Sequence, residues 1–316
     1  MKDFKDYSAM REVVIDTLVD LASDNKDVVM LDADLASAID SKNFKINFPN
    51  RYFNCGIAEA NMVGVAAGLS ASKLVPFCHT FGCFASRRVY DQMFLSVGYA
   101  HQVIHMIGSD PGIEAQANGG THMPFEDIAL MRQIPNINII EPSDFYSAYS
   151  LIKQLYKANK PSYIRVPRKS ATLRYDENST IELGKGIELL NGDDVAIIAT
   201  GMYMVNQALK ATDKLKESGI NATVVDLHTI KPLDEELISK VASRCKKIVV
   251  CENGRYAGGV GEMISNYIVQ TNPVAMSFVN VGEEYGEVGD IDYLSKRFKL
   301  TYSTIVDKAL ALIKSK

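Results

Sequence analysis

Short runs of β-branched residues alternate with helix-like stretches along most of this chain, and this alternation constrains the fold more than any other feature. The strand-like runs cover residues 28–31, 102–107, 137–140, 195–199, 222–226 and 247–251. The helix-like stretches cover residues 9–23, 59–72, 144–159 and 205–218. This order predicts an α/β fold, in which parallel sheets carry helices on both faces.

The length of the chain and one break in the alternation predict two domains. The chain has 316 residues, which is enough for two domains of ordinary size. Between residues 167 and 193 the pattern lapses into a polar stretch that ends at an Asn-Gly turn. We therefore expect two doubly wound domains, a larger one over residues 1–180 and a smaller one over residues 181–316.

Composition excludes several classes of protein. The chain is 47% hydrophobic and 23% charged, as globular proteins are, and its net charge of −4 suggests no surface for nucleic acid. Its longest nearly apolar stretch, residues 195–205, is well short of the roughly 20 residues that span a bilayer. The first ten residues lack the apolar core of a secretion signal. The five cysteines form no Cys-x-x-Cys pair and no metal-ligand cluster. We expect a cytoplasmic protein with reduced thiols that binds neither membranes nor nucleic acid and provides no metal ligands.

Residues 53–72 form a helical segment with almost no large side chains. Each interior glycine, such as Gly64 or Gly68, costs about 1 kcal/mol relative to alanine, so close packing against another backbone must compensate. Glu59 is the only charged residue in this segment and lies in the first helical turn. Two interpretations of Glu59 stay open. It is either a carboxylate that the helix dipole stabilises, or an acid that burial keeps protonated and able to donate a proton.

Two aromatic residues and two arginines follow a strand-like segment. Phe81 and Phe84 are three residues apart, so in a helical turn they share a face. Two rings on one face can hold a flat heterocycle, although ordinary core packing also explains them. Arg87 and Arg88 are adjacent, and we expect them to point apart from a solvated face.

A glycine-rich loop after the strand at residues 102–107 carries several polar side chains, namely Asp110, Glu114, Asn118 and His122. Proteins of the α/β class bind ligands outside the carboxyl ends of their strands. Because histidine exchanges protons near neutral pH, His122 is a candidate for proton transfer, with a structural role as the alternative. The glycines at 258, 259 and 261 lack the full Gly-x-Gly-x-x-Gly spacing, which favours tight packing over dinucleotide binding.

Taken together and in this order, these segments resemble the C-terminal half of transketolase. The matching segments are LDADLAS (31–37), FNCGIAEANMVGVAAGLS (53–70), HTFGCF (79–84), RRVYDQ (87–92), GGTHMPFEDIALMRQIPN (119–136) and SYIRVPRK (162–169). The resemblance extends over nearly the whole chain. It implies the pyrimidine-binding domain of a thiamine diphosphate enzyme followed by the C-terminal domain of the family.

The resemblance also implies a partner chain. Enzymes of this kind hold the diphosphate and Mg²⁺ through a Gly-Asp-Gly motif, and this sequence has none. A separate N-terminal transketolase subunit would therefore supply that half of the site, including the Mg²⁺ ligands. The expected assembly is a heterotetramer, with two partner subunits and two copies of this chain in contact. Asp34 matches an acidic residue near the subunit junction.

Roles for individual residues follow from the same resemblance. Glu59 would be catalytic and donate a proton to the aminopyrimidine ring of the cofactor. His122 would be catalytic as well and contact the donor substrate. Phe81 and Phe84 match the aromatic pocket around the pyrimidine, and Arg87 takes a cofactor-binding position where many relatives have tyrosine.

The remaining matches concern the substrate. Arg11 and Arg168 match arginines that bind the far phosphate of a sugar phosphate, and Ser37 would assist them. Asp110 stands where several relatives have histidine, and Asn118 stands where typical members have an aspartate that contacts a donor hydroxyl. An amide donates as well as accepts hydrogen bonds, so the preferred sugar differs from the usual one.

The implied reaction is transfer of a two-carbon ketol unit from an anionic ketose to an aldose. Candidate donors are ketose phosphates, including branched apulose 4-phosphate, and sulfofructose. One alternative is the β subunit of a 2-oxoacid dehydrogenase, and another is deoxyxylulose phosphate synthase, which normally carries both halves in one chain. Two more candidates are a non-catalytic subunit that completes a partner's fold and a nicotinamide oxidoreductase.

Overall fold

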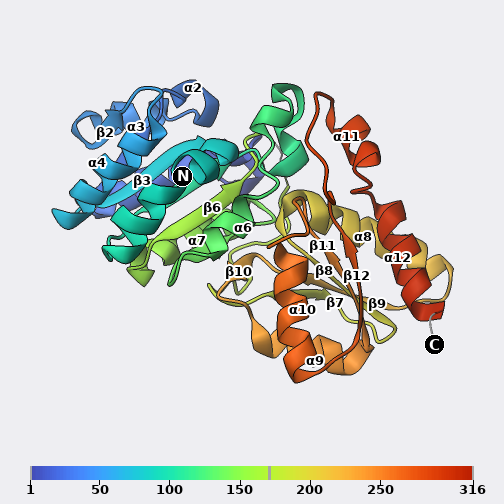
Figure 1. Ribbon diagram of the computed structural model, residues 1–316. Coiled ribbons are helices and arrows are strands. Elements are labelled where there is room, and N and C mark those ends of the chain that lie inside the picture. The colour runs from blue at the N-terminus through green and yellow to red at the C-terminus, as the bar shows by residue number, and fades with distance from the viewer. Residues whose placement is uncertain (1, 170–171, 315–316) are drawn as a thin grey trace.

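The computed structural model describes residues 2–169 and 172–314 (Figure 1). The first of its two sheets contains seven strands. Its strands are β1 (Val28–Asp32), β2 (Tyr52–Asn54), β3 (Val75–Phe81), β4 (His105–Ser109), β5 (Asn138–Ile140), β6 (Ser162–Val166) and β10 (Thr229–Lys231). They lie in the order β10-β5-β6-β4-β3-β1-β2. All neighbours are parallel except β10, which pairs antiparallel with β5.

Helices cover both faces of this sheet, as the sequence predicts. The α-helices of this part are α1 (Met10–Asp24), α2 (Ala36–Ile39), α3 (Lys42–Asn47), α4 (Glu59–Ala71), α5 (Tyr90–Gln92), α6 (Asp127–Arg132) and α7 (Phe145–Ala158). Shorter or irregular turns are η1 (Phe4–Asp6), η2 (Pro49–Arg51), η3 (Phe84–Arg88), η4 (Met93–Tyr99), η5 (Gly112–Asn118) and η6 (Gly120–His122). Along β1, Val28 and Met30 pack in one core cluster with residues of α1 and α7, while Val29 and Leu31 pack in another with residues of α4 and α6.

The second sheet has five strands and is also covered on both faces. Its strands are β7 (Ile187–Leu190), β8 (Val195–Ala199), β9 (Ala222–Asp226), β11 (Lys247–Cys251) and β12 (Ala275–Val279), in the order β12-β11-β8-β9-β7. The helices are α8 (Gly201–Glu217), α9 (Glu235–Cys245), α10 (Val260–Thr271), α11 (Ile291–Arg297) and α12 (Tyr302–Lys314). Only β7 is antiparallel to its neighbour. The predicted α/β class with two wound sheets is therefore confirmed, while the two antiparallel edges were not predicted.

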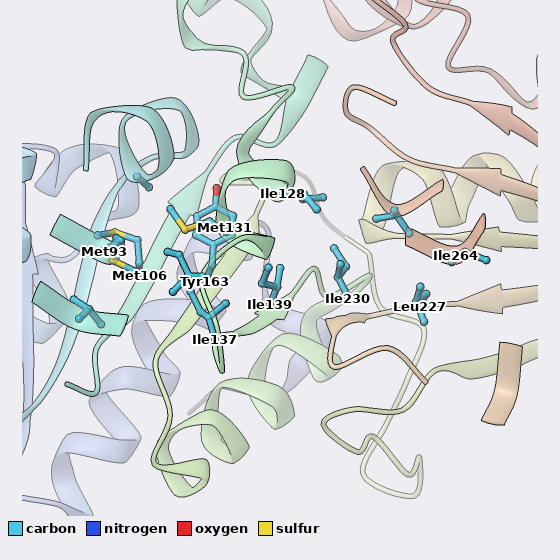
Figure 2. Packing of buried hydrophobic residues seen from close by; sticks show 14 of the residues in the cluster. Met93, Met106, Ile128, Met131, Ile137, Ile139, Tyr163, Leu227, Ile230 and Ile264 are labelled. Atoms are coloured by element: carbon cyan, nitrogen blue, oxygen red, sulfur yellow. The ribbon is translucent and has the colours of Figure 1, made fainter. Parts of the chain in front are cut away.

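The two sheets share part of one hydrophobic core. Figure 2 shows labelled side chains that continue from Met106 and Tyr163, past Ile139 and Ile230, to Ile264 of the second half. β10 comes from the C-terminal half of the sequence, yet it completes the first sheet. The predicted boundary near residue 180 falls between β6 and β7 and stays a prediction.

A buried ionic cluster also connects the halves. Arg165 on β6 is fully buried, and its Nε donates to Asp127 Oδ2 at 2.8 Å. Its Nη1 donates to Glu141 Oε1 at 2.5 Å. Its Nη2 donates to the carbonyl oxygens of Pro124, at 3.1 Å, and of Asn253 in the second half, at 2.8 Å. A single guanidinium thus holds β6, the end of β5, the start of α6 and the loop after β11 together.

Two predictions about the whole chain concern its cysteines and helices that could span a membrane. The five cysteines are free thiols, and all except the half-buried Cys55 are buried. Across residues 2–169 and 172–314, no helix has both the length and the apolar character needed to cross a bilayer.

Candidate active site

Glu59 is the first residue of α4, and its side chain is only 2% exposed. Arg88 Nη1 donates to both carboxylate oxygens, at 2.9 and 2.8 Å, and Thr80 Oγ1 donates to Oε1 at 3.5 Å. The N-terminus of a helix also favours a negative charge at this position. Glu59 is therefore a buried carboxylate that is neutralised by a neighbouring guanidinium in this structure.

Arg88 reaches Glu59 from the helical turn η3. Its guanidinium carbon lies 4.0 Å from the centre of the Phe84 ring, and its side chain is 46% exposed. From the sequence, Arg88 was expected on a solvated face, without a connection to Glu59. A signal was available, because Arg88 follows Phe84 by four residues, and that spacing places two side chains on one face of a helix.

Three aromatic rings meet next to this ion pair, and they come from three separate segments. Phe81 ends β3, Phe84 begins η3 and His122 ends η6. The ring centres of Phe81 and Phe84 are 6.3 Å apart, and those of His122 and the two phenylalanines are 5.7 and 5.2 Å apart. The structure thus brings the predicted aromatic pair and the predicted substrate-facing histidine together.

A buried histidine joins the strand ends from which these loops leave. His79 on β3 places Nδ1 3.2 Å from Asp32 Oδ2 on β1, and its Nε2 lies 3.1 Å from Ser109 Oγ on β4. All three side chains are fully buried. This network fixes the carboxyl ends of three neighbouring strands relative to one another.

The loop that carries His122 is held from two sides. A Cβ on Gly120 would lie 1.9 Å from the carbonyl oxygen of Gly286, so glycine is required for this close approach between the two halves. From the other side, Arg87 Nη2 donates to the Thr121 carbonyl at 3.0 Å, and Arg87 Nε lies 3.0 Å from Glu126 Oε1. These contacts of Arg87 go to the His122 loop, and its role at the cofactor stays a prediction.

The predicted anion-binding residues also lie close together. The backbone N–H of Arg11 donates to the carbonyl of Arg168 at 3.2 Å, and Arg11 Nη1 donates to the carbonyl of Ala38, the neighbour of Ser37, at 3.3 Å. Arg168 Nε donates to Asp110 Oδ2 at 2.7 Å, and Nη2 lies 2.5 Å from the same oxygen. The structure assembles these residues, while their roles stay predictions.

Arg168 connects this group to the aromatic rings, because its guanidinium carbon lies 4.7 Å from the centre of the Phe81 ring. A cavity of about 70 Å³ lies beside it, lined by residues 114–118 and by Asp110, Arg168 and Lys169. Asn118 is thus part of the same site, and Lys169 is a cation that was not predicted from the sequence. A wider groove of about 990 Å³ over α1 and α3 contains none of the candidate residues, so size alone does not locate the site.

The outer face of α4 is open. At Gly64 and Gly68, no atom of the described chain outside the helix lies within 4 Å of where a Cβ would stand. Ile57, just before the helix, is 78% exposed, and Val65 is 40% exposed. Asp34 is exposed on the loop after β1 and accepts a hydrogen bond from Asn54 Nδ2 at 2.8 Å. An exposed apolar face of small residues next to Glu59 is typical of a surface that contacts another chain.

Comparisons with known proteins give the same family for both halves. Residues 6–172 match the pyrimidine binding domain of transketolase, and residues 184–305 match the transketolase C-terminal domain. A 6-deoxy-6-sulfo-D-fructose transketolase subunit of Clostridium sp. (strain MSTE9) is 43% identical over 300 residues, which cover 95% of this chain and 93% of the relative. An apulose-4-phosphate transketolase subunit of Phocaeicola vulgatus is 33% identical over 308 residues, covering 97% of this chain and 98% of the relative.

A solved structure described as a split gene transketolase, inactive beta4 tetramer, superposes with a TM-score of 0.88 at 32% identity, covering 96% of this chain and 98% of that one. This coverage includes both halves of the chain, and each half also matches one transketolase domain. The chain therefore belongs to the transketolase family, in which it corresponds to the C-terminal subunit of a split transketolase.

Proposed function

We propose that this chain is the second subunit of a thiamine diphosphate-dependent transketolase, which moves a two-carbon ketol unit from an anionic ketose to an aldose. The observation that carries the proposal is the position of a buried acid, Glu59, next to the aromatic rings of Phe81, Phe84 and His122. Arg88 pairs with Glu59 and also lies over the Phe84 ring, so the acid and the rings belong to one site.

The residues present fit the pyrimidine half of the cofactor. When bound, thiamine diphosphate supplies a carbon nucleophile and an electron sink for the cleavage of the ketose. Phe81 and Phe84 would contact the flat ring and exclude water from it. Glu59 would hold a proton at the N1′ nitrogen of the pyrimidine. For this, the Glu59 carboxyl group must release the Arg88 guanidinium and contact the ring nitrogen instead.

The loop residues fit an anionic sugar. His122 would contact the hydroxyl or carbonyl groups of the donor, and Asn118 would contact a further hydroxyl. Arg11 and Arg168 would bind the anionic tail with help from Ser37. The names of the two relatives support this class of donor, since one refers to a sulfonated fructose and the other to a sugar phosphate.

The partner is the remaining part of the proposal. We place the diphosphate and Mg²⁺ ligands on an N-terminal transketolase subunit, because this chain has no Gly-Asp-Gly motif. The open face of α4 supports a contact with another chain beside Glu59. We expect a heterotetramer that contains two copies of each subunit.

Reconstitution tests the proposal. We expect no turnover by this chain alone and measurable release of aldehyde once the N-terminal subunit, thiamine diphosphate and Mg²⁺ are added. The donors are a panel of ketose phosphates and ketose sulfonates, and transfer is followed as formation of a new ketose from an added aldose. Turnover by the isolated chain would contradict the split site. Decarboxylation of a 2-oxoacid without ketol transfer would instead support the dehydrogenase alternative.

Arg88→Met should raise the affinity of the reconstituted complex for thiamine diphosphate by about tenfold, or about 1.4 kcal/mol. The substitution removes the ion pair that the pyrimidine ring must displace, and it leaves Glu59 buried without a cation until the cofactor binds. The half-exposed position of Arg88 keeps the expected effect moderate. Isothermal titration with the cofactor at saturating Mg²⁺ measures the change.

Arg297→Met is the matched control for that experiment, because Arg297 also pairs with carboxylates, those of Glu284 and Glu287, and lies over a phenylalanine ring, but away from the candidate site. We expect Arg297→Met to leave the cofactor affinity unchanged. Weaker cofactor binding by Arg88→Met would show that Arg88 helps to bind the ring rather than competing with it.

A further inference from the structure

The cavity after β4 has a balanced set of charges. Its ionisable lining residues are two cations, Arg168 and Lys169, and two acids, Asp110 and Glu114. Their formal charges cancel, so the cavity itself offers no excess positive charge to a doubly charged group. Arg11, the other predicted anion-binding arginine, does not line the cavity, and its backbone N–H donates to the carbonyl of Arg168.

The Asp110 carboxylate lies directly against the guanidinium that would bind the substrate tail. Arg168 contacts Asp110 Oδ2 through Nε at 2.7 Å and Nη2 at 2.5 Å, and the backbone nitrogen of Arg168 lies 3.4 Å from Oδ1. The side chains are only 12% and 6% exposed, so water and salt screen these charges weakly. An anion bound at Arg168 therefore lies close to a carboxylate that offsets the positive charge of the guanidinium.

That repulsion grows with the charge of the anion. A phosphate monoester carries about −1.5 to −2 at pH 7, whereas a sulfonate carries a single negative charge. Arg11 and Arg168 can donate hydrogen bonds to the oxygens of either tail. The attraction of the cations and the repulsion of Asp110 both grow in proportion to the charge of the ligand. The free energy lost when an ion leaves water grows with the square of its charge, so a site in which Asp110 offsets a cation favours the singly charged tail.

We propose that Asp110 is a specificity-determining residue that makes this subunit prefer a donor with a singly charged tail, such as a ketose sulfonate, over the corresponding phosphate monoester. The proposal rests on the transfer function proposed above. It assigns the preference to one carboxylate, and it predicts that neutralising this carboxylate weakens the preference.

Asparagine is a suitable replacement at this position. Asp110 has a backbone φ of +62°, a left-handed conformation that asparagine tolerates well. Its backbone N–H donates to the Val166 carbonyl at 3.0 Å, and the substitution leaves this contact in place. Asp110→Asn thus removes the charge and keeps the size of the side chain. Asp213→Asn, at an exposed position on α8, is a control that changes the net charge by the same amount.

The first measurement compares 6-deoxy-6-sulfo-D-fructose with D-fructose 6-phosphate in the complex with the N-terminal subunit, thiamine diphosphate and Mg²⁺. We expect the unmodified chain to give a kcat/KM at least about tenfold higher for the sulfonate. Asp110→Asn should shift this ratio toward the phosphate by about tenfold, and Asp213→Asn should leave it unchanged. A preference for the phosphate in the unmodified complex, or the same ratio in Asp110→Asn, would overturn the proposal.

A binding measurement separates this proposal from the proposed reaction. The same complexes are titrated with 2,3-dihydroxypropane-1-sulfonate and with glycerol 3-phosphate, which need no turnover. If neither ketose reacts but the ratio of the two dissociation constants shifts in Asp110→Asn, the charge selection is supported and the proposed reaction is wrong. If both ketoses react with one common ratio in all variants, the reaction is supported and the charge selection is overturned. Failure to bind either diol also overturns the charge selection.

Discussion

Glu59→Gln is expected to lower kcat of the reconstituted complex by about three orders of magnitude, within the range that a positioned acid or base contributes. Glutamine has the shape of the buried side chain at the start of α4, but it has no carboxyl proton to place on a ring nitrogen. Assembly with the partner subunit should be unchanged, because the substitution adds no volume. Steady-state kinetics with a saturating donor and size-exclusion chromatography measure the two effects.

The matched control for this variant is Glu236→Gln, since the Glu236 side chain is 85% exposed on α9 in the second half. We expect Glu236→Gln to keep its full activity. If Glu59→Gln retained activity within about tenfold of the unmodified complex, the chain would be a non-catalytic subunit that only completes the partner.

Arg165→Met should destabilise the chain by about 3–5 kcal/mol, the range measured when one member of a buried ion pair is removed. Methionine would leave Asp127 and Glu141 buried without their cation, and two carbonyl oxygens would lose a donor. Burial already raises the pKa of Glu141, and the positive charge of Arg165 opposes that rise. Urea denaturation followed by circular dichroism gives the change in the free energy of unfolding.

Two further variants keep this experiment interpretable. Arg297→Met removes an arginine that is 38% exposed and pairs with Glu284 and Glu287, and it should cost less than about 1 kcal/mol. Arg165→Met combined with Glu141→Gln removes one of the carboxylates left without a cation, so it should recover part of the lost stability. A loss of less than about 1 kcal/mol for Arg165→Met alone would mean that the cluster contributes little to stability.

The buried central strands of the second sheet were predictable from the sequence, whereas β6, a central strand of the first sheet, and the short edge strands were not. β8, β9 and β11 have the bounds expected from their continuous runs of β-branched residues, because strands covered on both faces need apolar side chains throughout. β10 has three residues and a partner about 90 positions away, so no local pattern reveals it. The strand expected over residues 102–107 begins three residues later, at His105.

Helix ends were predictable where a capping residue marks them. α7 begins after Asp144, whose side chain accepts from the Ser147 N–H, and it ends before Asn159 in a left-handed conformation. Both residues are recognisable signals. α8 begins at Gly201, four residues before the expected start. No side chain caps its first turn, so the sequence carries no clear signal for this end.

The candidate site shows the same division between local and distant contacts. The grouping of Phe81 with Phe84 follows from their spacing, whereas the burial of Glu59 was one of two interpretations that the sequence left open. The Arg88 contact with Glu59 and the Arg168 contact with Asp110 span 29 and 58 residues. Such contacts depend on how separate loops leave the sheet, and a single sequence does not specify that geometry.

β10 lies in the C-terminal half of the sequence but belongs to the first sheet, and this has a consequence for protein engineering. A chimera that joins residues 1–180 of this chain to the remainder of a relative would import one strand of the first sheet together with the second sheet. That strand covers the β5 edge, and an uncovered edge is available for pairing with other molecules. The crossover point of a functional hybrid is therefore set by compatibility between β5 and β10, even though the peptide connection near residue 180 is the obvious place to cut.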